Sequence, residues 1–289
     1  NPVWRYRRVF SEQQFPEIHS YMRKFRAVFD EYDARVSVGE IAYDLSPEIM
    51  SSYYGHPNAE GTMGDEIHLP FNFTLIDIEW NAEKIKAHVD AYEGAIPDYG
   101  WANYVLSNHD KPRLASKVGM EQARVAAMLL LTLKGTPTLY YGDEIGMTNV
   151  VIPEEKILDP QGKNKAGFNR DECRTPMQWD DNPNAGFSGE GVETWLPVAE
   201  NYDTLNVQHQ QTDPASILNF YHTLLHLRRD TPALHTGDYV SVDTAQEGCF
   251  VYIRSNEDIR YLIALNLTDV AKVLSLGNGG KGKIVLSTL

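Results

Sequence analysis

Two acidic residues each follow an apolar stretch of the sequence that predicts a buried strand. Glu40 ends the segment 36–40, and Asp110 ends the triplet Asn108-His109-Asp110 after a second such stretch. About two βα repeats separate the two acids, so both are expected at the carboxyl ends of parallel strands. Most enzymes that cleave a glycosidic bond use a pair of carboxyl groups as catalytic residues. The residue types and their spacing therefore indicate glycosidic chemistry.

Four apolar segments predict the strands that would position these acids. They cover residues 35–41, 68–73, 103–108 and 136–141, and their starts are 33, 35 and 33 residues apart. This spacing is typical of repeated βα units. Predicted helices at 16–29, 82–92, 121–133 and 215–229 complete the pattern, with Gly135 ending the third helix and Pro232 following the fourth.

The sequence pattern changes beyond residue 232. Short alternating runs at 249–254 and 261–267, separated by turn residues 256–258 and followed by a Gly-rich turn at 277–280, predict an antiparallel β domain. The stretch 148–211 is rich in Gly, Pro, Asn and Asp, and such a long loop usually serves a functional site or is disordered.

Four βα units are either half of a closed eight-stranded barrel or the whole of a small doubly wound sheet. Barrel enzymes gather their chemistry from the carboxyl ends of several strands, as Glu40 and Asp110 would require. A doubly wound nucleotide-binding protein would need a Gly-rich phosphate loop, and the sequence contains neither GxGxxG nor GxxxxGK[ST]. The barrel is therefore the favoured interpretation.

Composition excludes several classes of partner. The 289 residues carry a formal charge of −14, which would repel nucleic acid and anionic membranes and suits a neutral substrate. The apolar run 126–133 is too short to cross a bilayer, and Arg5, Arg7 and Arg8 stand where a secretory segment would be apolar. Two distant cysteines, Cys173 and Cys249, fit a reducing compartment. We therefore expect a cytoplasmic protein.

The histidines show no metal-ligand spacing such as HExxH. The sequence therefore predicts no metal site and no cofactor in this chain.

Four segments, in order, resemble motifs of the α-amylase family of glycoside hydrolases: 34–40, 105–110, 135–144 and 174–180. The α-glucosidase and oligo-1,6-glucosidase branch looks most similar, and the resemblance spans nearly the whole chain. By this resemblance Glu40 is the general acid and base, Asp110 is the second, stabilising acid, and His109 and Arg174 contact the innermost sugar. The pair Asp143-Glu144 matches a segment whose acids are structural. Arg174 has a simpler alternative role, an ion pair with a surface carboxylate such as Asp171.

The resemblance also identifies what this sequence does not contain. The family's nucleophilic Asp should precede Glu40, yet the 39 residues before Glu40 hold no matching motif. Asp30 and Asp33 fall between a helix and a strand, at the wrong end of the barrel. We therefore expect the C-terminal half of a (β/α)8 barrel at 1–232, with its last four βα units, and a small, incomplete antiparallel β-sandwich at 233–289. A structural calcium, if any, would lie in the missing N-terminal half.

The resemblance implies a retaining α-glucosidase that removes terminal α-linked glucose from oligosaccharides, with this chain inactive by itself. The missing half or another copy would pair with the open barrel edges. Two alternatives stay open: a transglycosylase or isomerase of the same family, such as a sucrose isomerase or trehalose synthase, and a non-enzymatic subunit that keeps the fold. The presence of both Glu40 and Asp110 argues against the subunit, because buried carboxylates are costly.

Overall fold

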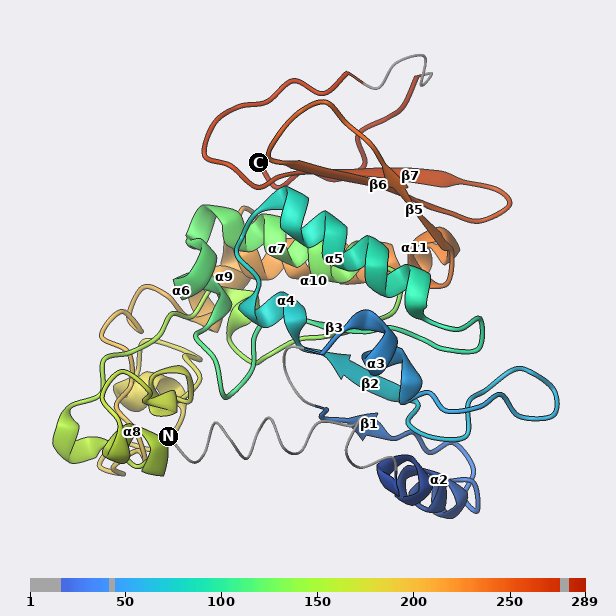
Figure 1. The fold of residues 1–289 in the computed structure, drawn as a ribbon. Coiled ribbons are helices and arrows are strands. Elements are labelled where there is room, and N and C mark those ends of the chain that lie inside the picture. Colours follow the sequence, from blue (N-terminus) through green and yellow to red (C-terminus); the bar gives the residue numbers. More distant parts are fainter. Residues whose placement is uncertain (1–16, 42–44, 276–280) are drawn as a thin grey trace.

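The computed structural model describes residues 17–41, 45–275 and 281–289, and its N-terminal part contains a parallel sheet (Figure 1). The strands are β1 (Val38–Gly39), β2 (Leu69–Asn72), β3 (Asn103–Val105) and β4 (Thr136–Thr138), paired in the order β1-β2-β3-β4. The register pairs Gly39 with Pro70, Phe71 with Asn103, and Val105 with Thr138. Each strand lies inside a predicted segment and is shorter than it, so the βα pattern is confirmed.

Helices connect these strands and cover the sheet. They are α2 (Glu17–Phe29), α3 (Pro47–Ser52), α4 (Thr74–Asp77), α5 (Ala82–Ala95), α6 (Leu114–Val118), α7 (Met120–Thr132), α10 (Ile217–Asp230) and α11 (Pro232–His235). The four predicted helices correspond to α2, α5, α7 and α10. Side chains fix two of their starts, because Asn81 accepts from the Lys84 N–H and Ser216 accepts from the Asn219 N–H. The short helices α3, α4 and α6 were not predicted.

Helix α7 lies at the centre of the core and is buried on both sides. Leu129 and Leu130 pack in the main core cluster, which extends to Phe250 and Tyr252 of the C-terminal sheet. Leu131 packs in a second cluster, against α10. A helix that is apolar all round is stable only in such a position. In Figure 1, α5, α7 and α10 accordingly lie between the parallel sheet and the C-terminal sheet.

The C-terminal sheet is antiparallel, as predicted, and consists of β5 (Asp238–Val242), β6 (Cys249–Ser255) and β7 (Arg260–Asn266). β5 was not predicted. A sandwich needs two sheets, and the part of the chain that the structure describes beyond residue 232 contains one.

Two buried arginines join this end of the chain to α7. Arg228 donates to the carbonyls of Leu131 and Leu133, at 2.8 and 3.0 Å, and Arg254 donates to the carbonyl of Thr132 at 2.6 Å. These are carbonyls at the C-terminal end of α7, which no helical N–H satisfies.

The stretch 148–211 is irregular, as expected, but it contains short helical turns. These are η3 (Glu154–Lys156), α8 (Pro160–Asn164), η4 (Arg170–Cys173), η5 (Pro183–Gly186) and α9 (Val207–Thr212); η2 (Asp143–Ile145) lies just before them. None of the helices in the described ranges is both long and apolar enough to span a membrane. Arg5, Arg7, Arg8 and the turn at 277–280 lie outside the described residues.

Candidate active site

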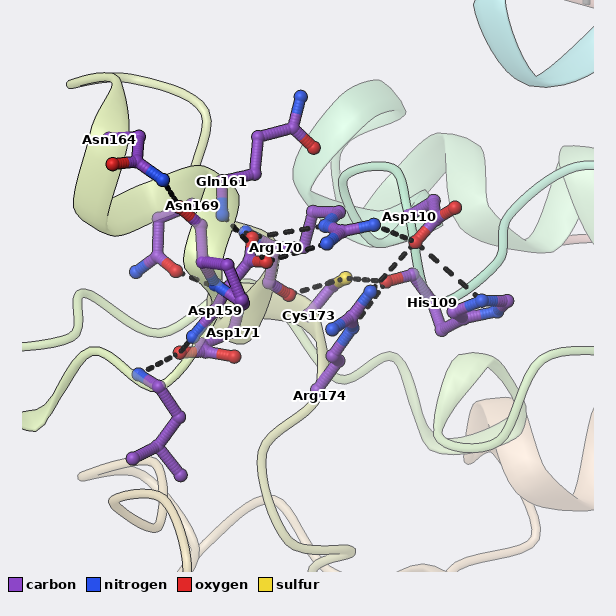
Figure 2. Close-up of polar contacts among 12 residues, drawn as sticks. His109, Asp110, Asp159, Gln161, Asn164, Asn169, Arg170, Asp171, Cys173 and Arg174 are labelled. Atoms are coloured by element: carbon purple, nitrogen blue, oxygen red, sulfur yellow. Dashed lines mark hydrogen bonds and ion pairs between the residues drawn. The ribbon is translucent and has the colours of Figure 1, made fainter.

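Asp110 lies in the loop that follows β3, and a local turn sets its position. The side-chain oxygen of Asn108 accepts the backbone N–H of Asp110 at 2.9 Å, which forms an Asx turn. The Asp110 carboxylate is three-quarters buried and reaches toward the turn η4, as Figure 2 shows. The Asn-His-Asp triplet thus uses its first residue to orient its last.

Arg174 and His109 both lie against Asp110 (Figure 2). Arg174 Nη2 donates to Asp110 Oδ1 at 2.7 Å, and Arg174 Nε donates to the His109 carbonyl at 2.7 Å. His109 Nε2 is 3.6 Å from the same Oδ1 atom. The structure therefore brings together three of the four residues singled out by sequence. The alternative pairing of Arg174 with Asp171 is not found, because Asp171 accepts the backbone N–H groups of Leu158 and Asp159.

A second arginine, Arg170, also binds Asp110 and was not predicted. Arg170 Nη1 is 3.1 Å from Asp110 Oδ1, and the same guanidinium donates to both carboxylate oxygens of buried Asp159, at 2.6 and 3.0 Å. This charge-assisted pair holds the pKa of Asp159 well below its usual range and raises the pKa of Arg170. Arg170 stands four residues before Arg174, but outside an α-helix this spacing does not indicate a shared partner.

Both guanidinium groups use the same oxygen of Asp110. Among the described residues, no hydrogen bond or ion pair involves the other oxygen, Oδ2. A carboxylate held on one oxygen and open on the other is suited to accept hydrogen bonds from hydroxyl groups. The arrangement can therefore bind and orient a polyol such as a sugar.

Tyr140 and Tyr141, which follow β4, hold the backbone on either side of Arg174. The Tyr140 hydroxyl donates to the Cys173 carbonyl at 3.1 Å, and the Tyr141 hydroxyl donates to the Thr175 carbonyl at 2.6 Å. The buried guanidinium of Arg113 lies 5.3 and 4.6 Å from the two ring centres. The resulting tyrosine clamp, Tyr140 with Tyr141, fixes the loop that carries Arg174.

Cys173 stays a thiol in this arrangement. Its Sγ atom is 3.4 Å from the His109 carbonyl and 3.1 Å from the Arg170 carbonyl, and burial raises its pKa to about 11. A thiol with such a pKa is a poor nucleophile at neutral pH.

Asp143 is buried at η2, and Glu144 beside it is partly buried. Ser107 Oγ donates to Asp143 Oδ2, and burial raises the pKa of Asp143 to about 7 and also raises the pKa of Glu144. The structural role that the sequence indicated for both acids stays a prediction.

Glu40 lies apart from this group. It follows β1, two strands away from β3 in the sheet, and both acids follow the carboxyl ends of their strands. Its side chain is exposed at the mouth of a cavity of about 680 Å³ between α2 and β1, which Phe25, Val36 and Val38 also line. No contact in the described part of the chain joins Glu40 to Asp110, His109 or Arg174. The structure therefore does not bring Glu40 into the group formed by Asp110, His109 and Arg174.

The described residues contain no group of three or more His, Cys, Asp or Glu side chains that could hold a metal ion.

Comparison with known proteins places these residues in a family context. Residues 7–237 match the family described as "Alpha amylase, catalytic domain". Maltase A1 of Drosophila melanogaster is 34% identical over 91% of this chain and 47% of its own length. The glucan 1,6-alpha-glucosidase of Streptococcus pneumoniae is 31% identical over 94% of this chain and 56% of its own length.

Solved structures give the same result. The alpha-glucosyl transfer enzyme XgtA superimposes with a TM-score of 0.78 at 31% identity, over 87% of this chain and 46% of that enzyme. The trehalulose synthase MutB from Pseudomonas mesoacidophila MX-45 superimposes with a TM-score of 0.76 at 30% identity, over 87% and 50%. The chain spans about half the length of the relatives it matches. On these grounds, the chain belongs to the α-amylase family.

Proposed function

We propose that this chain is the part of a retaining α-glucosidase that carries the general acid and base, Glu40, and the stabilising acid, Asp110. The observation that carries the proposal is the Arg174 contact to Asp110 at 2.7 Å with His109 alongside, since it leaves a carboxylate oxygen free for a sugar hydroxyl. The similarity to maltase A1 and to oligo-1,6-glucosidases supports the choice of an α-linked glucose at the chain end.

In the proposed reaction, the nucleophilic carboxylate bonds to the anomeric carbon while Glu40 protonates the leaving glycosidic oxygen. Glu40 then acts as a base and takes a proton from water, whose oxygen attacks the anomeric carbon and releases the carboxylate. Asp110 accepts hydrogen bonds from hydroxyl groups of the same sugar through Oδ2 and favours a distorted ring, while Arg174 and His109 fix the orientation of the sugar. The nucleophilic carboxylate comes from a preceding stretch of polypeptide. Retention of configuration requires that carboxylate to stand roughly 5 to 5.5 Å from the Glu40 carboxyl group.

The same stretch of polypeptide is proposed to complete the barrel. Among the described strands, β1 and β4 are the edges of the parallel sheet, and an open edge favours pairing with another strand. Phe25, Val36 and Val38 are each more than half exposed beside β1 and form an apolar surface that a further βα unit, or another copy of the chain, would cover. Such a cover would also desolvate Glu40.

The test is hydrolysis of p-nitrophenyl α-glucoside by this chain alone and after addition of a polypeptide with the preceding barrel half of a relative. We expect turnover only from the mixture, and its loss in a mixture made with Glu40→Gln. Turnover by the isolated chain would overturn the proposal. A mixture that forms a complex, seen by light scattering, and turns over equally well with Glu40→Gln would overturn the role of Glu40.

A second function is favoured by the similarity to a trehalulose synthase. In a transglycosylase or isomerase the glycosyl intermediate would form on the same nucleophilic carboxylate, and a hydroxyl group of a second sugar rather than water would receive the glycosyl group. Product analysis separates the two functions: glucose from maltose supports the hydrolase, and conversion of sucrose into an isomeric disaccharide supports the isomerase.

A further inference from the structure

Two histidines stand on the outer face of α10, one helical turn apart. His222 is exposed and His226 is partly exposed, whereas Tyr221 and Leu224 on the opposite face are buried. Their Nε2 atoms are 3.0 Å apart, and their ring centres are 4.3 Å apart. Residues four apart on a helix share one face, so the backbone itself brings these two nitrogen atoms together.

We propose that His222 and His226 form a surface site for a divalent transition-metal ion such as Zn²⁺ or Ni²⁺. Imidazole nitrogen suits these ions, whereas Mg²⁺ and Ca²⁺ prefer oxygen ligands. With metal–nitrogen bonds of about 2.0 to 2.1 Å, two adjacent ligands of one ion are separated by about 2.9 to 3.4 Å. The Nε2 atoms already have this separation, so rotation of the rings to aim both lone pairs at one ion would not need to move the two atoms apart. The two histidines supply two ligands, and water supplies the others.

The hydrogen bonds around His226 define what must change on binding. Arg229 Nη2 lies 2.8 Å from His226 Nδ1, and a guanidinium only donates, so Nδ1 accepts. The proton of neutral His226 is then on Nε2 and faces His222 Nε2. A metal ion takes the lone pairs of both Nε2 atoms, so the His226 proton moves to Nδ1 and each ring stays neutral.

Arg229 opposes this change, because it cannot accept the new Nδ1–H. Its Nη2 atom, which also donates to Asp230 Oδ2 at 3.1 Å, must move away from His226, whereas the contact from Nε to Asp230 Oδ1 at 2.7 Å does not involve that atom. A residue that accepts from Nδ1–H would instead support the metal-bound form. Position 229 therefore sets the affinity of the site without contributing a ligand.

The experiment is calorimetric titration of ZnCl₂ and NiCl₂ into the untagged whole chain, with MgCl₂ as the comparison ion. We expect one ion per chain for Zn²⁺ or Ni²⁺ and no heat of binding for Mg²⁺. His222→Ala and His226→Ala should each weaken binding at least about tenfold, because the second ring binds in an intramolecular step. The matched control is His235→Ala, which removes another exposed histidine and should leave the affinity unchanged.

Arg229→Gln gives a readout that nonspecific binding to surface histidines would not produce. Its side-chain oxygen can accept from His226 Nδ1–H, so we expect binding several-fold tighter than in the unaltered chain. Equal affinity in the His222→Ala variant, or an equal loss in the His235→Ala control, would overturn the site. Weaker binding in Arg229→Gln would overturn the proton arrangement. Circular dichroism of each variant checks that α10 is intact.

Discussion

Arg174 reaches Asp110 across 64 residues of chain, and its Nη2 atom donates to Asp110 Oδ1 at 2.7 Å. Both side chains are about three-quarters buried, so the pair is less screened by solvent than an ion pair on the open surface. The contact joins the loop after β3 to the long stretch 148–211.

This link should be measurable as a coupling energy. In a double-mutant cycle with Arg174→Ala and Asp110→Ala, we expect a coupling of about 1 to 2 kcal/mol in the free energy of unfolding, as for charge-assisted hydrogen bonds in partly buried sites. Urea denaturation of the four proteins provides the measurement. The matched control is the exposed pair Arg229 and Asp230, for which no measurable coupling is expected. Equal coupling in the two pairs would contradict the prediction.

Asp143 should make the stability of the chain depend on pH. Burial raises the pKa of its folded-state carboxyl to about 7, above the ordinary value of 3.8. Between these two values the unfolded state has lost its proton and the folded state keeps it, so stability falls as pH rises from about 4 to about 7. The difference is on the order of 4 kcal/mol at most.

Asp143→Asn removes this dependence. Relative to the variant, the unaltered chain should lose free energy of unfolding across that pH range, as measured by urea denaturation at several pH values. Asp230→Asn, at an exposed carboxylate, serves as the control and should not change the slope in this way. A constant difference between the unaltered chain and Asp143→Asn would show that Asp143 ionises at its ordinary pKa.

The hydroxyl groups of the tyrosine clamp should contribute to the stability of the folded chain. Tyr141→Phe keeps the ring against Arg113 and removes one hydrogen bond to the Thr175 carbonyl, so we expect a loss of about 1 kcal/mol in the free energy of unfolding. In an assembled, active enzyme the same change should raise KM more than it lowers kcat, since the clamp positions Arg174. Tyr32→Phe, at an exposed tyrosine, is the control. Unchanged stability and kinetics in Tyr141→Phe would show that the Tyr141 hydroxyl does not help to position Arg174.

The core around α7 should be the most sensitive part of the molecule to truncation. Leu129→Ala leaves a cavity between α7 and its neighbours, because Leu129 is fully buried, and it should cost about 2 to 5 kcal/mol. Leu225→Ala on α10 removes the same atoms from a side chain that is 43% exposed and should cost far less. Thermal denaturation of the two variants tests this ranking. A smaller loss of stability in Leu129→Ala than in Leu225→Ala would contradict the prediction.

The local sequence pattern was enough to predict the four parallel strands and the long helices. The four parallel strands lie within the predicted segments; β3 is fully buried, whereas β1 and β4 are at most partly buried. The edge strand β5 was missed: it is partly exposed and begins with Asp238, although Tyr239, Val240 and Val242 are residues that strands favour.

The candidate site was predicted in part. Sequence motifs singled out His109, Asp110 and Arg174, and these lie together. Arg170 and its partner Asp159 were missed, because hydrogen-bond partners inside a loop of some sixty residues are chosen by tertiary structure and leave no periodic pattern. The exposure of Glu40 was also not predictable from sequence, since it depends on which polypeptide covers β1.

The buried arginines Arg228 and Arg254 make the end of α7 depend on segments that lie later in the chain. Both donate to the last carbonyl groups of α7, and one of them is on β6. Removal of the C-terminal sheet would therefore remove Arg254 and leave the buried carbonyl oxygen of Thr132, at the end of α7, without this hydrogen-bond donor. The region after residue 232 thus contributes to the stability of the rest of the fold. A shortened version of the chain that ends before β6 should therefore be less stable than the whole chain.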